Sequence, residues 1–278
     1  MSYRTILVHA DTSRHAKDRI AFAATLARTY DAHLVGAALT GVSRFLPPVA
    51  IEQGGQLVAE QIALMRQAAD DALALFEQQA AGLGVDSREG RLVNDDLDGG
   101  MALQARYADL TIVSQTDPDD PALGAWRDLP EYVLLNAARP LLVLPYAGRH
   151  EHVGSHVLVA WDGSMEATRA LACALPLLRD AALVSVVVFN PGEGDGVHGE
   201  QPGADIAMYL SRHGVRVEVC AQLTGIDVGN ALLSLAADTG ADLLVMGGYG
   251  HARYRELLLG GVTRTILRSM TLPVLMAH

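Results

Sequence analysis

Short apolar runs alternate with longer helical patterns along this chain. The apolar runs fall at 5–9, 32–39, 85–92, 109–113 and 140–144, then at 157–161, 182–189, 215–221, 242–246 and 273–277. The helical patterns between them lie at 13–30, 56–82, 96–106 and 128–137, then at 164–179, 203–213, 228–238 and 261–269. Continuous apolar strands that alternate with helices are typical of parallel sheets buried on both faces. The pattern therefore predicts an α/β chain of two tandem five-stranded, doubly wound parallel sheets.

The two halves of the chain repeat each other in sequence. Asp11 matches Asp162 at an offset of 151, whereas Asp109 matches Asp242 at an offset of 133. The difference of 18 residues places an insertion in the middle of the first half, mostly within 40–84. We expect that the helical pattern of this insertion packs on its own sheet. The predicted division is a first domain at 1–147, a linker at 148–155 and a second domain at 156–278.

Glycines follow the fourth apolar run of the second half, at the sheet edge where doubly wound folds bind ligands. Gly250 lies three residues after Gly247, Gly260 follows nine residues later, and Gly261 opens the last helical pattern. Glycine lets the backbone approach an anion closely, and a helix N-terminus presents free N–H groups to it. This arrangement indicates a phosphate cradle, although the same glycines also suit tight turns and close helix–sheet packing.

These glycines, together with Val-Leu-Val-Ala-Trp-Asp-Gly-Ser at the first strand, resemble the nucleotide-binding signature of the universal stress protein family. The resemblance covers the whole chain as two tandem copies. It implies a Rossmann-like fold of the adenine nucleotide alpha hydrolase type and a bound adenine nucleotide, ATP or a related one, with or without Mg²⁺. It places the nucleotide against Ala160, Asp162, Val188, Gly247, Gly250, His251, Gly260, Gly261, Val262 and Thr263. Gly261 stands where ATP-binding members carry Ser or Thr, so one hydroxyl contact to phosphate is missing.

Several of these residues also have a purely structural interpretation. Asp162 would lie near the adenine or ribose, but it also suits an Asx turn or a helix N-cap. Ala160 and Val188 would line the base pocket. His251 falls in a loop with Arg253 and Arg255, where a phosphate contact and simple solvation are both open.

The first half lacks the glycine signature. Gly247 corresponds to Ser114, and Gly250 corresponds to Asp117. The replacement loop carries Asp117, Asp119, Asp120 and Asp128. Carboxylates repel phosphates by about 4 kcal/mol per charge pair at 4 Å near a protein surface. We therefore expect no nucleotide in the first half and interpret these residues as turn formers and solvated charges, with a divalent cation as the alternative.

Composition and charge exclude some classes of binding partner. Lys+Arg 21 against Asp+Glu 32 gives a net charge of −11, which argues against nucleic acid because such partners need a basic face. No apolar run approaches the roughly 20 residues that span a membrane, and the N-terminus lacks a signal-peptide layout. Cys173 and Cys220 fit buried free thiols in a reducing cytosol. A cytoplasmic location is therefore expected.

The sequence contains no familiar catalytic or metal-ligating set, such as Gly-x-Ser-x-Gly, His-Glu-x-x-His or Cys-x-x-Cys. Three hypotheses stay open: a stress-response sensor that binds an adenine nucleotide, a weak ATP hydrolase using the same cleft, and an interaction protein without nucleotide. The resemblance also implies dimerisation through the last strand. Here 140–144 and 273–277 would pair antiparallel within one chain as a pseudo-dimer, covering both edges. A further homodimer stays open.

Overall fold

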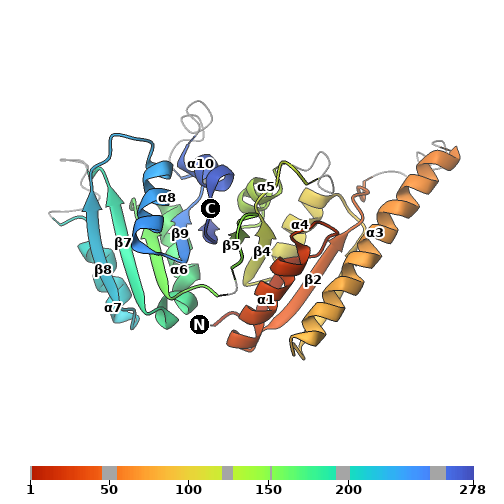
Figure 1. The fold of residues 1–278 in the computed structure, drawn as a ribbon, viewed down its shortest axis with the longest axis horizontal. Coiled ribbons are helices and arrows are strands. Elements are labelled where there is room, and N and C mark those ends of the chain that lie inside the picture. Colours follow the sequence, from red (N-terminus) through yellow and green to blue (C-terminus); the bar gives the residue numbers. More distant parts are fainter. Residues whose placement is uncertain (1, 46–54, 121–127, 151, 192–200, 251–260) are drawn as a thin grey trace. The chain divides into compact units, whose positions relative to one another are not determined.

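The computed structural model describes residues 2–45, 55–120, 128–150, 152–191, 201–250 and 261–278. The chain forms two compact units, one of Tyr3–Arg139 and one chiefly of Pro140–His278 (Figure 1). Each predicted strand and helix is present, and its ends differ from the predicted ends by three residues at most. The α/β class with mostly parallel strands is confirmed.

The first unit contains four parallel strands in the order β3-β2-β1-β4. Its elements are β1 (Thr5–His9), α1 (Ala16–Tyr30), β2 (His33–Leu39), α3 (Gly55–Gly82), β3 (Arg88–Val93), α4 (Leu97–Ala105), β4 (Leu110–Ser114) and α5 (Leu129–Asn136). Strand β1 pairs with β2 on one side and with β4 on the other. Helix α1 contacts α3, and α4 contacts α5.

The second unit repeats this order and adds one strand. Its elements are β5 (Leu141–Leu144), β6 (His156–Ala160), α6 (Met165–Asp180), β7 (Leu183–Phe189), α7 (Ala204–Arg212), β8 (Val217–Gln222), α8 (Val228–Thr239), β9 (Leu243–Gly247), α10 (Val262–Ser269) and β10 (Val274–Ala277). The strand order is β5-β10-β9-β6-β7-β8. All neighbours are parallel except β5 and β10, which pair antiparallel with Leu142 opposite Leu275.

The antiparallel pairing of the two last strands was predicted from the repeat and is confirmed. It also explains the grouping of β5. The repeat places this strand at the end of the first half, yet its hydrogen bonds to β10 make it part of the second compact unit.

The strands carry the hydrophobic core of each unit. The middle residues of β1, β4, β6 and β9 are buried without alternation, as expected for strands covered on both faces. Within the described part of the chain no helix is long and apolar enough to cross a membrane. Cys173 and Cys220 form no disulfide, and both are partly exposed, so the prediction of buried thiols is wrong in that respect.

The insertion of the first half lies largely in α3. This helix has 28 residues, whereas α7 has 9. Its C-terminal half packs on the sheet, where Phe76 is fully buried and its ring lies against Gly36. The N-terminal half extends away, and Leu57 and Leu64 there are 81% and 65% exposed (Figure 1). Packing of the insertion on its own sheet is thus confirmed for the C-terminal half only.

Candidate functional site

The second unit contains a cleft of about 290 Å³ at the carboxyl ends of β6, β7 and β9. The cleft brings together six of the residues predicted from the sequence. They are Ala160, Asp162, Gly247, Gly250, Val262 and Thr263. Residues that the sequence analysis missed form most of the wall. They are Trp161, Ser164, Val187, Phe189, Val228, Leu232 and Met246. The cleft is therefore apolar on its walls, with a few polar groups at its edge.

Val188 is buried but does not line the cleft. Val187 and Phe189 do, because successive side chains of a strand point to opposite faces. Val188 points toward Gly203, at the start of α7; a Cβ placed on that glycine would lie 3.3 Å from Val188 Cγ2. A shift of one residue along β7 thus separates the predicted lining from the observed one.

The remaining predicted residues lie at the edge of the cleft or outside the described residues. Gly261 is the N-cap of α10, next to the cleft residue Val262, and is not itself a lining residue. His251 and Gly260 lie outside the described residues, as do Arg253 and Arg255. Arg264, in the first turn of α10, is exposed.

The turn from β6 to α6 is held by two side chains. Asp162 Oδ1 accepts a hydrogen bond of 2.9 Å from the Ser164 amide, which closes an Asx turn. Ser164 Oγ is the N-cap of α6 and accepts from the Ala167 amide at 3.1 Å. Asp162 therefore has the structural role that its sequence also allowed, while its side chain is exposed at the edge of the cleft.

Gly247 allows α6 to pack closely against the end of β9. A Cβ at this position would lie 2.5 Å from the Ala167 nitrogen and 2.8 Å from the Glu166 carbonyl carbon. A side chain would therefore push against helix backbone, which cannot move locally. Gly247 is thus required by packing, whatever it contributes to a ligand.

The turn at the end of β9, residues 247–250, is called the glycine turn here. It is held in place by α10 and by the last strand, β10. Thr263 Oγ1 accepts a hydrogen bond of 3.0 Å from the Tyr249 amide, and Thr263 is 1% exposed. Tyr249 has a positive φ of 55°, and the Gly248 amide donates to the Ala277 carbonyl at 2.9 Å. Gly250 therefore lies at a defined place beside the N-terminus of α10, where anions are stabilised.

The family comparison agrees with this location. The model of the Universal stress protein family matches residues 155–278, which contain the whole cleft. The second half of the chain therefore matches the universal stress protein family. The glycine turn, the first-strand Asp162 and the last helix are thus in the half that matches the family model directly.

Curated universal stress proteins match parts of the chain. One from Synechocystis sp. is 29% identical over 147 residues, 52% of this chain and 49% of that protein. One from Methanocaldococcus jannaschii is 36% identical over 44 residues, 16% of this chain and 27% of that protein. The chain therefore spans about half the length of the first relative and about a quarter of the second.

Solved structures extend the likeness to both halves. The crystal structure of a universal stress protein from Archaeoglobus fulgidus DSM 4304 covers 98% of this chain and 94% of its own, with a TM-score of 0.73 and 15% identity. A functionally unknown protein from Pseudomonas aeruginosa PAO1 covers 98% and 92%, with a TM-score of 0.57 and 16% identity. At these identities the likeness shows the tandem fold alone.

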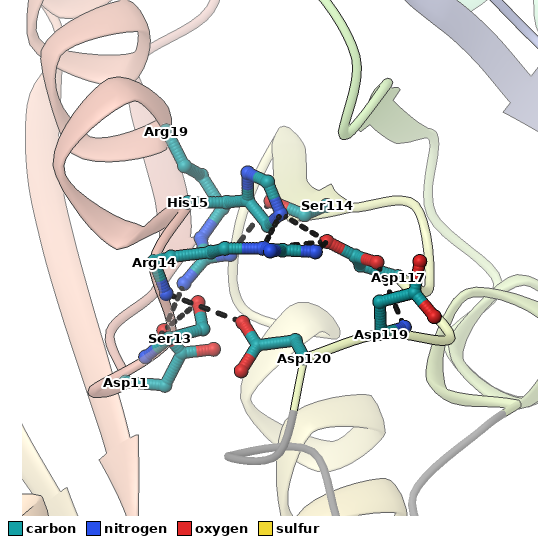
Figure 2. Close-up of polar contacts among 9 residues, drawn as sticks. All are labelled: Asp11, Ser13, Arg14, His15, Arg19, Ser114, Asp117, Asp119 and Asp120. Carbon is teal, nitrogen blue, oxygen red and sulfur yellow. Dashed lines mark hydrogen bonds and ion pairs between the residues drawn. The ribbon is translucent and has the colours of Figure 1, made fainter.

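The first unit has side chains where the second has a cleft (Figure 2). Arg19, 2% exposed, lies between the ends of β1 and β4. It donates to the His9 carbonyl at 2.8 Å, to Ser114 Oγ at 2.7 Å and to Asp11 Oδ1 at 2.7 Å. Because Ser114 corresponds to Gly247, this arginine fills the space in front of the lost glycine.

A second ionic group closes the first unit at the position of Gly250. Asp117, which replaces that glycine, is 2% exposed. Its carboxylate accepts from Arg14 Nε at 2.8 Å and contacts His15 Nε2 at 2.7 Å (Figure 2). The residual cavity measures about 20 Å³. Among the described residues, the first unit therefore leaves only this small cavity at the position that corresponds to the cleft of the second unit.

This arrangement corrects the interpretation of Asp117 and Asp120 as solvated charges, whereas Asp119 and Asp128 are exposed as predicted. Asp117 does form a turn, because its Oδ1 accepts from the Asp119 amide at 3.0 Å. However, Asp117 and Asp120 are buried, and Asp120 Oδ2 accepts from the Arg14 amide at 3.2 Å. Burial raises the pKa of Asp117, but hydrogen bonds from His15 and Arg14 outweigh it and hold this pKa below its usual range. Filled space and paired charge, not bare repulsion, close this site.

The buried network also shifts the pKa values of its own members. Burial lowers the pKa of His9 from 6.5 to about 4, although the Asp11 carboxylate opposes this shift. Burial raises the pKa of Asp11, but Arg19 and His9 bring it well below its usual range. Among the described residues, no group of three or more His, Cys, Asp and Glu side chains is arranged to hold a metal ion.

Proposed function

We propose that this chain binds an adenine nucleotide in the cleft of its second unit and acts as a nucleotide-responsive regulator in a stress response. The observation that carries the proposal is the composition of the cleft. The lining includes Trp161, Phe189 and Met246, whose apolar surfaces suit the faces of a purine. It also includes Gly250 and Val262, the first residue of α10, and a helix N-terminus suits a phosphate.

The size of the cleft supports a small ligand. Its volume of about 290 Å³ lies just below the range of roughly 300–1,000 Å³ typical of small-molecule sites. Asp162, at the edge of the cleft, is placed for a sugar hydroxyl or a base amine. Gly261 lacks a hydroxyl but keeps its backbone N–H. The match of residues 155–278 to the family model supports the same ligand class.

The proposal is tested by ligand binding to the full chain. We expect adenosine, AMP or ATP to raise the melting temperature, because a ligand at 100 times its Kd adds about 2.7 kcal/mol of stability. Isothermal titration calorimetry then gives the Kd and the number of sites. An unchanged melting temperature with all three compounds at millimolar concentration would contradict the proposal.

A substitution at Gly250 tests the location. A Cβ on Gly250 would lie 3.1 Å from Glu166 Oε2 and 3.5 Å from Ser164 Oγ, so Gly250→Val crowds the cleft. We expect at least a tenfold loss of affinity. Gly225→Val is the matched control, because a Cβ on Gly225 has no neighbour within 4 Å. Binding that survives Gly250→Val would mean that the ligand lies elsewhere.

A further inference from the structure

We infer that Glu166 makes the cleft selective for adenine ligands of low charge, a nucleoside or a nucleoside monophosphate, over nucleoside triphosphates. The inference rests on the proposed function and adds the chemical class of its ligand. It concerns the contact between Gly247 and Gly250 and the first turn of α6.

The Glu166 carboxylate lies against the glycine turn. Glu166 is the second residue of α6, and its Oε2 is 3.1 Å from the place that a Cβ of Gly250 would occupy. The backbone and Cβ of the same residue pack against Gly247, which fixes the point from which the side chain extends. Glu166 is partly buried and forms no ion pair within the described part of the chain. Its negative charge is thus present where a phosphate would approach Gly250.

The first unit shows what an anion at this place requires. By the repeat offsets, His15 corresponds to Glu166 and Asp117 to Gly250. His15 Nε2 contacts the Asp117 carboxylate at 2.7 Å, and Arg14 binds the same oxygen (Figure 2). An anion at this position is therefore held by side chains from the start of α1. In the second unit the corresponding residues are Met165 and Glu166, which provide no cation and one carboxylate.

Glu166 lies behind the lining residues Gly247 and Gly250, and the described lining of the cleft offers no cation against its charge. Asp162 is the one ionised side chain of this lining and is also negative. The first-turn amide of Ala167 is already bonded to Ser164 Oγ, so α6 offers fewer free donors to a phosphate. Each further phosphate of a ligand therefore adds repulsion from Glu166. A ligand with one phosphate or none avoids most of this repulsion while keeping the apolar contacts of the base.

The experiment compares adenosine, AMP and ATP by calorimetry in EDTA on the wild-type chain and on Glu166→Gln. The wild type is expected to bind AMP and adenosine more tightly than ATP. In Glu166→Gln the affinity for ATP is expected to rise about tenfold and the affinity for AMP less, while adenosine changes by less than twofold. Asp205→Asn, an exposed carboxylate in the first turn of α7, is the matched control and should leave all three affinities unchanged.

Two results would overturn the inference, and they are distinguishable from failure of the proposed function. If the wild type binds ATP at least as tightly as AMP and Glu166→Gln changes nothing, Glu166 does not select charge, although the nucleotide site stands. An equal gain for all three ligands would show a change of shape instead of charge. If no adenine compound binds to either protein, the proposed function fails, and the inference fails with it. Melting curves of both variants show whether the fold is kept.

Discussion

At the scale of single residues, the buried histidine of the first unit makes stability depend on pH. His9 is 4% exposed, and its Nδ1 lies 3.4 Å from Asp11 Oδ2. The pKa of His9 is about 4 in the folded chain and 6.5 in a free side chain. Between these values the unfolded chain binds a proton that the folded chain does not bind. Stability is therefore lost as the pH falls through this window.

We predict that the free energy of unfolding of the first unit decreases by about 3 kcal/mol between pH 7 and pH 4 through His9 alone. Urea unfolding across this range should show a shallower pH dependence for His9→Asn than for the wild type. His152→Asn, at an exposed position, should keep the wild-type slope. Asp11 also loses its contribution as the pH falls, but at lower pH, because its pKa is depressed from an already acidic value. Equal slopes for wild type and His9→Asn would refute the role of His9.

The residues of the candidate site were predictable to different degrees. Asp162 and Gly250 follow the ends of strands, and the edge of a parallel sheet collects such positions, so their meeting could be foreseen. Val187 could not be told from Val188, because β7 is apolar on both faces and its sequence does not alternate. The pairing of Asp117 with Arg14 and His15 spans over a hundred residues, and no local pattern signals it.

At the scale of elements, the contact between α6 and β9 depends on the missing side chain at Gly247. We predict that Gly247→Ala destabilises the second unit by about 1–3 kcal/mol, because its Cβ would meet helix backbone at 2.5 Å and force α6 outward. Gly225→Ala, which meets no neighbour, should change stability by less than about 0.5 kcal/mol. The urea unfolding midpoints of the two variants test this predicted difference in stability. Wild-type stability of Gly247→Ala would mean that α6 adjusts without cost.

Elements were more predictable than single contacts, because apolar runs and helical periods extend over many residues. The strands β1 and β7 and the helix α8 lie within one residue of their predicted bounds. Helix α3 was predicted over its full length, but its sequence did not show that only half of it is covered. The apolar positions of α3 continue through Leu57 and Leu64, beyond the part of the helix that the sheet covers. Whether these side chains are buried depends on the extent of the sheet, which the sequence of the helix does not reveal.

At the scale of the whole molecule, the two repeats share one fold but differ in the side chains at the corresponding site. The second unit has glycines and a cleft of about 290 Å³, whereas the first has Arg19 and Asp117 in a space reduced to about 20 Å³. The net charge of −11 therefore includes carboxylates that are already paired inside the first unit. Of the two corresponding places in the described residues, the one in the second unit therefore offers more space to a ligand.

We therefore predict a stoichiometry of one adenine ligand per chain in calorimetric titration. The first unit stays closed because Arg19 is held by three acceptors, so the loss of Asp117 alone does not open it. Asp117→Ala should lower the stability of the first unit, since it leaves Arg14 and His15 without their carboxylate, but it should alter neither the stoichiometry nor the Kd. Gly250→Val in the other unit should abolish the single site. Two ligands per wild-type chain, or a Kd that changes with Asp117→Ala, would show that the first unit still takes part in binding.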